Sequence, residues 1–319
     1  FILQENLFKW GMPDVVVAQS DPSDYGRLSG VFDLIVADVP CSGEGMFRKD
    51  PTAVAQWSEA NVEMCSRRQR RIIADVWPSL REGGYLIYST CTFNCRENEE
   101  NIAWILSELG GEVVALPVPE AWNVTGNLNG SDFPVYRFLP HRTRGEGFFM
   151  AVIRKTDATP RRYADGKGKR TKNNPSADFP SEWLIDADSF RSLLRGTTVY
   201  AVRAAYYAQV QQWCAHLNIL SPGTEIGERK GKDFVPAPAL ALTTMLRQEN
   251  FPTVKMNYEA AINYLRREIF SPDTQIIPRG YALVAYDGLP LGFIKHLGNR
   301  TNNLYPSEWR IRSTLSVRK

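Results

Sequence analysis

The sequence has few of the residues that build disulfide frameworks and metal centres. Its 319 residues include five cysteines, an odd number, with no Cys-x-x-Cys pair, and three scattered histidines. A zinc site needs three or four suitably spaced ligands, and a disulfide scaffold needs paired cysteines. We therefore expect neither a metal nor disulfides, and we expect reduced thiols in a cytoplasmic protein.

Long apolar runs and a strong net charge are also missing. No apolar stretch approaches the roughly 20 residues that span a bilayer, so no membrane partner is expected. The net charge is only +3, so affinity for nucleic acid must come from local basic patches. The chain shows no secretory signal and begins with Phe1 rather than Met, so we expect an N-terminal part to be missing.

What the sequence does contain is two cysteine motifs, each following a short apolar run that predicts a buried strand. Residues 38–45 read Asp-Val-Pro-Cys-Ser-Gly-Glu-Gly and follow Phe32 to Ala37. Residues 89–92 read Ser-Thr-Cys-Thr and follow Tyr85 to Tyr88. The long stretch between them, Trp57 to Leu80, predicts a helix that begins after Ser58 as its N-cap.

This order of strand, helix and strand places three reactive side chains together. Strands connected in this way are parallel and lie close to each other. Ligands of such sheets bind beyond the carboxyl ends of the strands. We therefore expect Asp38, Cys41 and Cys91 to converge on one site.

The residues after Cys91 predict a helix that would activate its thiol. Asn94 and Glu97 have the spacing of a capping box. The positive helix end and the Arg96 cation would both favour the thiolate and lower the pKa of Cys91. Cys65 lies on an apolar helix stripe and is interpreted as a core residue, and Cys95 as a structural one.

Two further positions near the motifs have alternative interpretations. Val15 to Ala18 predicts a short strand that ends before Asp21, at the same sheet edge. Asp21 either caps a turn or contacts a nucleotide ligand, and the spacing leaves both open. Arg48 and Lys49 belong either to a solvated loop or to a contact with a substrate phosphate.

The remaining chain predicts the end of this sheet and two further blocks. Strands expected to complete the sheet are Val113 to Leu116, Val135 to Leu139 and Phe148 to Ile153. Residues 154–172 then carry eight basic and two acidic residues, which is typical of a linker. A second block starts near Phe179. A third starts near Thr224 and ends in a predicted hairpin; its expected elements are helices at Ala237 to Gln248 and Tyr258 to Arg267, and strands at Gly280 to Tyr286 and Leu291 to Lys295.

Two thiols and a carboxylate suit covalent chemistry on a pyrimidine. A cysteine protease would need a positioned imidazole, and neither motif contains one. A thiolate can instead add to C6 of cytosine while Asp38, hydrogen-bonded at N3 in its protonated form or by a shared proton, stabilises the developing charge. C5 then accepts a methyl group, a second thiolate or a water removes the C5 proton, and the first thiol leaves.

The two motifs, together with Glu97-Asn98-Glu99, resemble those of the NOL1/NOP2/Sun family of RNA 5-methylcytosine methyltransferases. The run from Gly43 to Asp50 is most similar to the bacterial branch that modifies small-subunit rRNA. The stretch from Gly280 to Leu304 resembles the PUA-like RNA-binding domain of that branch. The resemblance covers most of the chain and is weakest between Lys155 and Thr224.

This resemblance implies an α/β architecture. Residues 1–155 would be the C-terminal portion of a Rossmann-like class I methyltransferase domain. Residues 156–223 would be a basic linker and a small middle domain, and residues 224–319 a PUA-like mixed α/β RNA-binding domain. We expect a monomer that acts on RNA, with 16S rRNA as the substrate.

The resemblance also implies roles for individual residues. Cys91 would be the nucleophile and Cys41 the thiol that assists release. S-adenosylmethionine would be the cofactor, bound by Asp21, Asp38 and Pro40, with Asp38 also facing the base. The positions expected to bind the RNA are Arg48, Lys49, Lys295 and Arg300.

One departure from the family leads to a second interpretation. The family's first strand with its Gly-rich cofactor loop, and the next strand with its acidic residue, do not occur in this sequence. We therefore expect a fragment that, alone, neither binds S-adenosylmethionine nor transfers methyl groups. The alternative function is a non-catalytic RNA-binding or ribosome-assembly module. A DNA cytosine methyltransferase that uses only Cys41 is disfavoured because it leaves Thr90-Cys91 unexplained.

Overall fold

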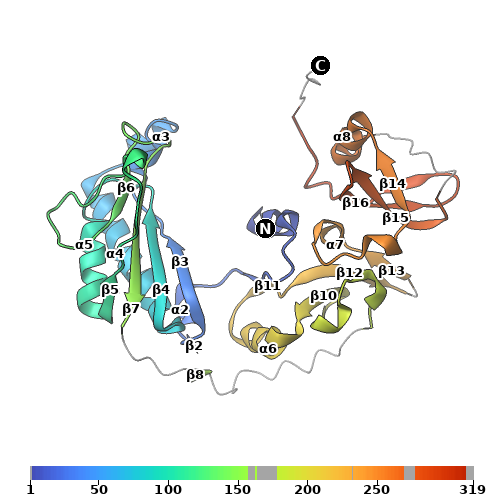
Figure 1. The fold of residues 1–319 in the computed structure, drawn as a ribbon, viewed down its shortest axis with the longest axis horizontal. Helices are drawn as coiled ribbons and strands as arrows, with labels where there is room; N and C mark the ends of the chain where they lie inside the picture. Colours follow the sequence, from blue (N-terminus) through green and yellow to red (C-terminus); the bar gives the residue numbers. More distant parts are fainter. Residues whose placement is uncertain (1, 157–161, 164–177, 232, 269–276, 314–319) are drawn as a thin grey trace. The chain divides into compact units, whose positions relative to one another are not determined.

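The chain forms two compact units, residues 20–167, and residues 1–19 together with 168–319. The computed structural model describes residues 2–156, 162–163, 178–231, 233–268 and 277–313. Each unit has its own sheets (Figure 1). Each also has its own hydrophobic core. The predicted α/β class is confirmed.

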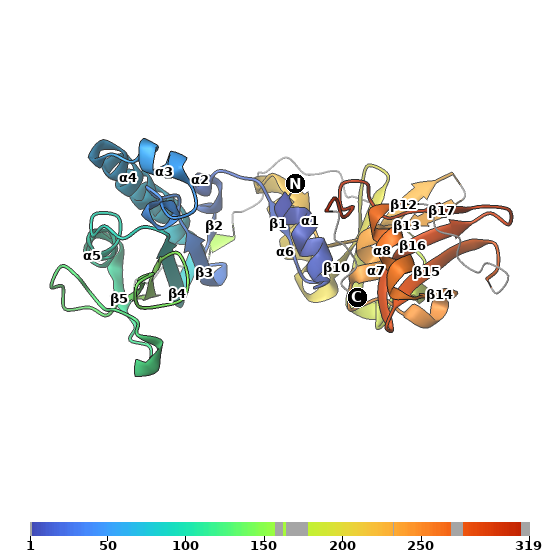
Figure 2. The same ribbon diagram turned by 90° about the horizontal axis from the view of Figure 1, so that it is seen from above.

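The unit of residues 20–167 is a sheet with helices along one face. Its strands are β2 Leu28–Ser29, β3 Phe32–Asp38, β4 Leu80–Thr90, β5 Gly111–Val113, β6 Tyr136–Phe138, β7 Phe148–Lys155 and β8 Arg162–Tyr163. Its helices are α2 Pro22–Tyr25, α3 Pro51–Gln56, α4 Glu59–Val76 and α5 Glu99–Ile105. Figures 1 and 2 show α4 running alongside the strands.

The main sheet has the strand order β3-β4-β7-β5, and β6 also pairs with β7. β3 and β4 are parallel, with Asp38 opposite Ser89, and β7 pairs antiparallel with β4 and β5. The prediction of two parallel neighbouring strands is therefore confirmed. This register brings the two cysteine motifs to the same edge of the sheet.

Helix α4 begins and packs as its sequence predicts. The Ser58 hydroxyl accepts a hydrogen bond from the Asn61 backbone N–H at 3.1 Å, which caps the first turn. Val62, Cys65 and Ile73 lie on the buried stripe, so the interpretation of Cys65 as a core residue is confirmed. Ile73 packs with Tyr88 in the core between α4 and the sheet.

The edge strand β3 carries apolar side chains on the face opposite α4. Leu34 is 50% exposed and Val36 is 64% exposed, whereas Ile35 and Ala37 pack against the core. This alternation is the expected two-residue period of a strand. The edge of β3 that does not face β4 pairs with no strand among the described residues.

The second unit combines two four-stranded sheets with a two-stranded pair. Its strands are β1 Val17–Ala18, β9 Phe190–Arg195, β10 Thr198–Arg203, β11 Ile219–Ser221, β12 Thr224–Lys230, β13 Asp233–Pro236, β14 Thr253–Met256, β15 Gly280–Tyr286, β16 Leu289–His296 and β17 Thr301–Asn303. Its helices are α1 Ile2–Trp10, α6 Tyr207–His216, α7 Pro238–Leu242 and α8 Tyr258–Arg266. The sheet orders are β13-β12-β10-β9 and β14-β15-β16-β17.

One core joins the two sheets of this unit. Phe190 and Ile226 from the first sheet share a cluster with Leu240 of α7 and with Leu283 and Phe293 of the second sheet. β12 pairs with β10, so the first sheet crosses the boundary expected between residues 223 and 224. The three-domain division stays a prediction.

The predicted hairpin near the C-terminus is confirmed. β15 and β16 pair antiparallel and are joined at Asp287-Gly288. Both turn residues have positive φ angles, 48° and 76°, which the favoured two-residue hairpin turn requires. The helix at Tyr258 is also confirmed as α8.

Four expectations about elements are wrong. The strand expected at Val113 to Leu116 is shifted and ends at Val113, because β5 covers Gly111–Val113. β1 does not join the cysteine sheet, because Val17 and Ala18 pair antiparallel with β11 in the other unit. α5 begins at Glu99 rather than after Asn94. The helix expected from Ala237 to Gln248 is limited to the five residues of α7, because Thr243 already has an extended backbone with ψ 146°.

The basic stretch of residues 154–172 is only partly described. Arg154 and Lys155 are the last residues of β7, and residues 157–161 and 164–172 lie outside the described residues. Across the described residues, no helix combines the length and apolarity that a membrane span requires.

Candidate active site

The two motif cysteines meet at the carboxyl ends of β3 and β4. The backbone N–H of Val39 donates to the carbonyl of Ser89 at 3.1 Å, which continues the parallel pairing one residue beyond β3. The Cys41 and Cys91 Sγ atoms are 3.2 Å apart, and both side chains are half-buried. The structure therefore places the two thiols in direct contact.

This contact changes the acidity of both thiols in opposite directions. The hydrogen bond from Cys41 is the main cause that lowers the pKa of Cys91 to about 7, against the opposing effect of burial. The same bond, with burial, raises the pKa of Cys41. Cys91 is therefore the thiol of the pair that ionises first as the pH rises through neutrality, and its thiolate accepts a hydrogen bond from Cys41.

The cause expected for the low pKa of Cys91 is wrong. The Arg96 guanidinium donates to Glu63 at 2.7 Å and also pairs with Glu100, so its charge is already neutralised. α5 begins eight residues after Cys91, and a helix end acts mainly within its own first turn. The neighbouring thiol acts in place of the helix and the cation.

Asp38 and Pro40 are exposed beside the thiols. The Asp38 carboxylate accepts a hydrogen bond from the Ser89 hydroxyl at 3.2 Å, and its charge raises the pKa of Cys91. The Pro40 carbonyl accepts from the Gln69 amide at 3.0 Å. An exposed carboxylate with one hydrogen bond retains lone pairs that a polar ligand can use.

Asp21 lies in another local setting. One oxygen, Oδ1, accepts from the Ser23 backbone N–H at 3.1 Å and from its hydroxyl at 2.8 Å, which caps α2. The hydrogen bonds from Ser23 lower the pKa of Asp21. The strand before it, β1, belongs to the other unit, so the cysteine sheet does not position Asp21.

The four predicted RNA-binding residues fall into both units. Arg48 and Lys49 are exposed, and each lies 3.7 Å from a carboxylate oxygen of Glu146. Lys295 donates to the Tyr281 hydroxyl at 3.2 Å and lies over its ring, and Arg300 is exposed before β17. The ionic contacts of Arg48 and Lys49 are long and both cations are exposed, so both can exchange Glu146 for another anion.

A buried polar network behind the thiols was missed by sequence reasoning. Gln69, in the middle of the basic helix α4, is fully buried and donates to the Glu97 carboxylate at 2.6 Å. The buried Tyr88 hydroxyl donates to the Glu97 carbonyl at 2.7 Å. The one available signal was Gln69 itself, a neutral side chain on the buried stripe between four arginines.

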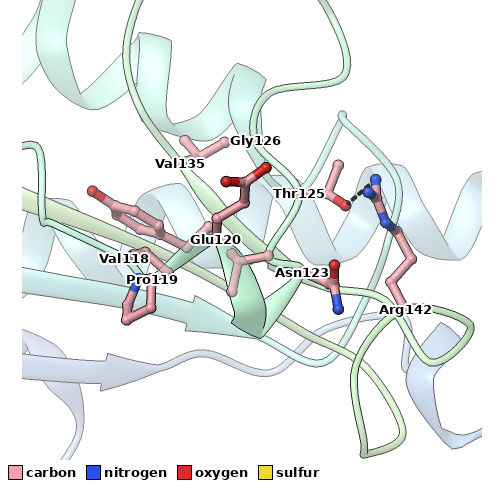
Figure 3. Close-up of a pocket in the computed structure, with 10 residues that line it drawn as sticks. Val118, Pro119, Glu120, Asn123, Thr125, Gly126, Val135 and Arg142 are labelled. Atoms are coloured by element: carbon pink, nitrogen blue, oxygen red, sulfur yellow. Dashed lines mark hydrogen bonds between the residues drawn. The ribbon is translucent and has the colours of Figure 1, made fainter.

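A separate cavity of about 300 Å³ lies in the segment between β5 and β7 (Figure 3). Thr125 and Arg142 line it and form a hydrogen bond of 3.2 Å, with Glu120 and Asn123 close by. None of the predicted site residues is among the side chains that surround this cavity. The candidate chemistry therefore belongs to the cysteine pair.

Comparison with known families agrees with this geometry. Residues 2–154 match the family described as 16S rRNA methyltransferase RsmB/F, and residues 251–311 match the methyltransferase RsmF PUA domain. The chain contains an RsmB/F family domain followed by an RsmF PUA domain. The resemblance drawn from the two cysteine motifs and from the C-terminal stretch is confirmed.

Curated relatives of this chain are named ribosomal RNA small subunit methyltransferase F. The protein from Shewanella loihica is 28% identical over 317 residues, covering 96% of this chain and 64% of its own length. The protein from Klebsiella pneumoniae is 28% identical, with 96% and 65% covered. The chain thus spans somewhat less than two thirds of the length of these relatives.

A solved structure is also similar to part of this chain. It is NSun6 from Pyrococcus horikoshii, solved with SFG, with 31% sequence identity and a TM-score of 0.38. The match covers 44% of this chain and 34% of that protein.

Proposed function

We propose that the complete protein methylates C5 of a cytosine in small-subunit rRNA, with S-adenosylmethionine as methyl donor. The observation that carries the proposal is the contact of Cys41 and Cys91 at 3.2 Å, at the carboxyl ends of two parallel strands. The names of the curated relatives support a small-subunit rRNA substrate. Cytosine is proposed because a thiolate beside an exposed carboxylate suits covalent activation of that base.

Cys91 is proposed as the nucleophile. Its pKa of about 7 makes about half of the thiol ionised at neutral pH, so the attacking form is present without an external base. Its sulfur would form a bond to C6 of the base, and the electron pair of the C5–C6 double bond would make C5 nucleophilic. Asp38, in its protonated form or through a shared proton, would donate a hydrogen bond to N3 and stabilise the negative charge that develops there.

Cys41 is proposed to act after methyl transfer. Once Cys91 is bonded to carbon, it no longer carries the charge that raises the pKa of Cys41, so Cys41 can ionise more easily. Cys41 would then remove the C5 proton. The C5–C6 double bond would re-form as the bond between C6 and the Cys91 sulfur breaks, which returns Cys91 as a thiolate.

The cofactor would supply an electrophilic methyl group. Among the residues expected to bind it, Asp38 and Pro40 are exposed at the end of β3 and fit a polar ligand. Asp21 fits less well, because its Oδ1 already accepts two hydrogen bonds within the cap of α2. Arg48, Lys49, Lys295 and Arg300 are proposed to contact RNA phosphates.

The role assignment is tested in the complete protein with S-adenosylmethionine and small-subunit rRNA. Cys41→Ala removes the releasing thiol, so we expect a covalent protein–RNA adduct that survives denaturation. Cys91→Ala removes the nucleophile and should give no adduct. An adduct formed by Cys91→Ala but not by Cys41→Ala would reverse the roles.

The same experiment separates catalysis from the alternative function. A non-catalytic RNA-binding or assembly module would bind RNA equally well in both variants and the parent, and none would form an adduct or transfer a methyl group.

A further inference from the structure

Two carboxylates join the two cysteine loops in opposite directions. Glu44 belongs to the loop after β3 and accepts from the Phe93 and Asn94 backbone N–H groups, at 2.6 and 2.9 Å. These residues stand two and three positions after Cys91. The Glu44 carboxylate thus fixes the backbone of the second loop from the first.

Glu97 makes the reverse connection. Its side chain is fully buried, and it accepts from the Ser42 backbone N–H at 3.0 Å, directly after Cys41. The Gln69 amide of α4 donates to the same carboxylate at 2.6 Å. The second loop and the helix therefore hold the backbone beside Cys41.

The Asn94 amide links both carboxylates. Its Nδ2 group lies 3.0 Å from Glu44 Oε1 and 2.8 Å from Glu97 Oε1, and its Oδ1 accepts from the Glu97 N–H at 2.9 Å. The Gly45 N–H donates to the Cys91 carbonyl at 2.7 Å. A Cβ at Gly45 would lie 2.5 Å from that carbonyl oxygen, so the two loops are packed at backbone contact.

The charge of these carboxylates cannot explain their presence beside a thiolate. The negative charge of Glu97 raises the pKa of Cys91 and so works against ionisation. Burial opposes the ionisation of Glu44 too, but hydrogen bonds from Phe93, Asn94 and other neighbours hold its pKa below the usual value. Glu44 thus remains an anion in spite of the cost of burial, and the hydrogen bonds of both carboxylates run to the backbone of the opposite loop, which indicates a geometric role.

We propose that Glu44 and Glu97 are positioning residues that hold Cys41 and Cys91 in sulfur contact. Each carboxylate fixes the backbone next to the partner cysteine of the opposite loop. The inference rests on the proposed function for its catalytic meaning, but the sulfur contact is measurable without RNA or cofactor. Failure of the adduct experiment and failure of this inference are therefore distinguishable.

The test compares Glu44→Gln and Glu97→Gln with Glu82→Gln, an exposed control on β4. The readout is the pH dependence of Cys91 alkylation by iodoacetamide, resolved from the other cysteines by peptide mass spectrometry. A positioning role predicts that both variants lose the hydrogen bond from Cys41 and that the pKa of Cys91 rises. A rise from about 7 to about 8 lowers the alkylation rate at pH 7 about fivefold. The control should match the parent.

A purely electrostatic role predicts the opposite sign, because removing a negative charge favours the thiolate. An unchanged or lowered pKa in folded Glu44→Gln and Glu97→Gln proteins would overturn the inference. Thermal unfolding measured in parallel shows whether each variant is folded. Glu44 is only partly buried, so Glu44→Gln should lower the stability of the folded protein less than Glu97→Gln does. If both variants fail to fold, the carboxylates serve folding in general and the positioning role is also overturned.

Discussion

At the scale of single residues, the reactivity of the site depends on one sulfur contact. Cys41 and Cys91 are separated by 50 positions in the sequence and by 3.2 Å between their Sγ atoms. A thiol that donates to a thiolate stabilises it, as any hydrogen bond to a charged form does. The acidity of Cys91 is therefore a property of the pair.

We predict that Cys41→Ala raises the pKa of Cys91 from about 7 toward the ordinary thiol value. The substitution removes the donor that favours the thiolate, while the opposing charges of Asp38 and Glu97 remain. Alkylation of Cys91 at pH 7 should then slow several-fold and recover at higher pH. Rates measured across pH 6 to 10 check this.

Cys214→Ala is the matched control, since Cys214 lies in the other unit. It should leave the pH profile of Cys91 unchanged. If the pH profile of Cys91 alkylation is the same with and without Cys41, the hydrogen bond from Cys41 is not the cause of the low pKa of Cys91.

The sequence predicted the thiols and the carboxylate but not the network around them. A cysteine after an apolar run is visible locally. The partners of Glu97 are not, because Gln69 and Ser42 stand 28 and 55 positions away. A polar side chain gives no sign of its partner until the helix and both strands are assembled.

At the scale of elements, a buried ion pair connects α5 to β6. The Arg137 side chain is 1% exposed, and its Nε donates to the fully buried Glu99 at 2.9 Å. Arg137 also donates to the Phe93 carbonyl at 2.7 Å, two residues after Cys91. The ion pair therefore holds the second cysteine loop in place at Phe93.

We predict that Arg137→Met destabilises the protein by about 3 to 5 kcal/mol, because it leaves the Glu99 charge buried without a cation. Chemical denaturation with fluorescence detection measures the difference. Arg154→Met, which removes the exposed pair with Glu112 at 3.2 Å, should cost less than about 1 kcal/mol. If both variants lose the same free energy of unfolding, burial does not strengthen the effect of the Arg137 ion pair.

Elements with a strong local pattern were predicted correctly, and those without one were not. α4 has an N-cap, an apolar stripe and 18 residues, so local information is sufficient. β1 has only two residues, and Val17 pairs with Ser221, which no local pattern indicates. α5 starts late because Glu97 and Asn98 are used in loop contacts before helical bonding begins.

At the scale of the whole molecule, the net charge is only +3. RNA affinity must therefore come from local groups of cations. The PUA domain carries Lys295, Arg300 and Arg310, and the latter two are exposed. Phosphate contacts release counterions, so binding through them weakens as salt rises.

We predict that RNA binding by this chain falls steeply between low and moderate salt. In the triple variant Lys295→Ala, Arg300→Ala and Arg310→Ala, the slope of log K against log salt should decrease by about 0.7 to 0.9 for each lost phosphate contact. Fluorescence anisotropy with a labelled rRNA fragment measures both slopes.

Arg81→Ala, on β4 and paired with Asp33, removes a charge from the unit of residues 20–167 and should leave the slope unchanged. An affinity that is insensitive to salt would show that these cations do not bind phosphate.

The contact of the two sulfurs has a toxicological consequence. Soft elements such as trivalent arsenic prefer thiolates and gain affinity when one centre binds two at once. An isolated thiol such as Cys65, buried in the core, offers only one sulfur, whereas Cys41 and Cys91 together form a ready chelate. The pair that is proposed to activate a base is therefore also a site where arsenicals should inhibit this protein, and a small dithiol that competes for the arsenic should reverse the inhibition.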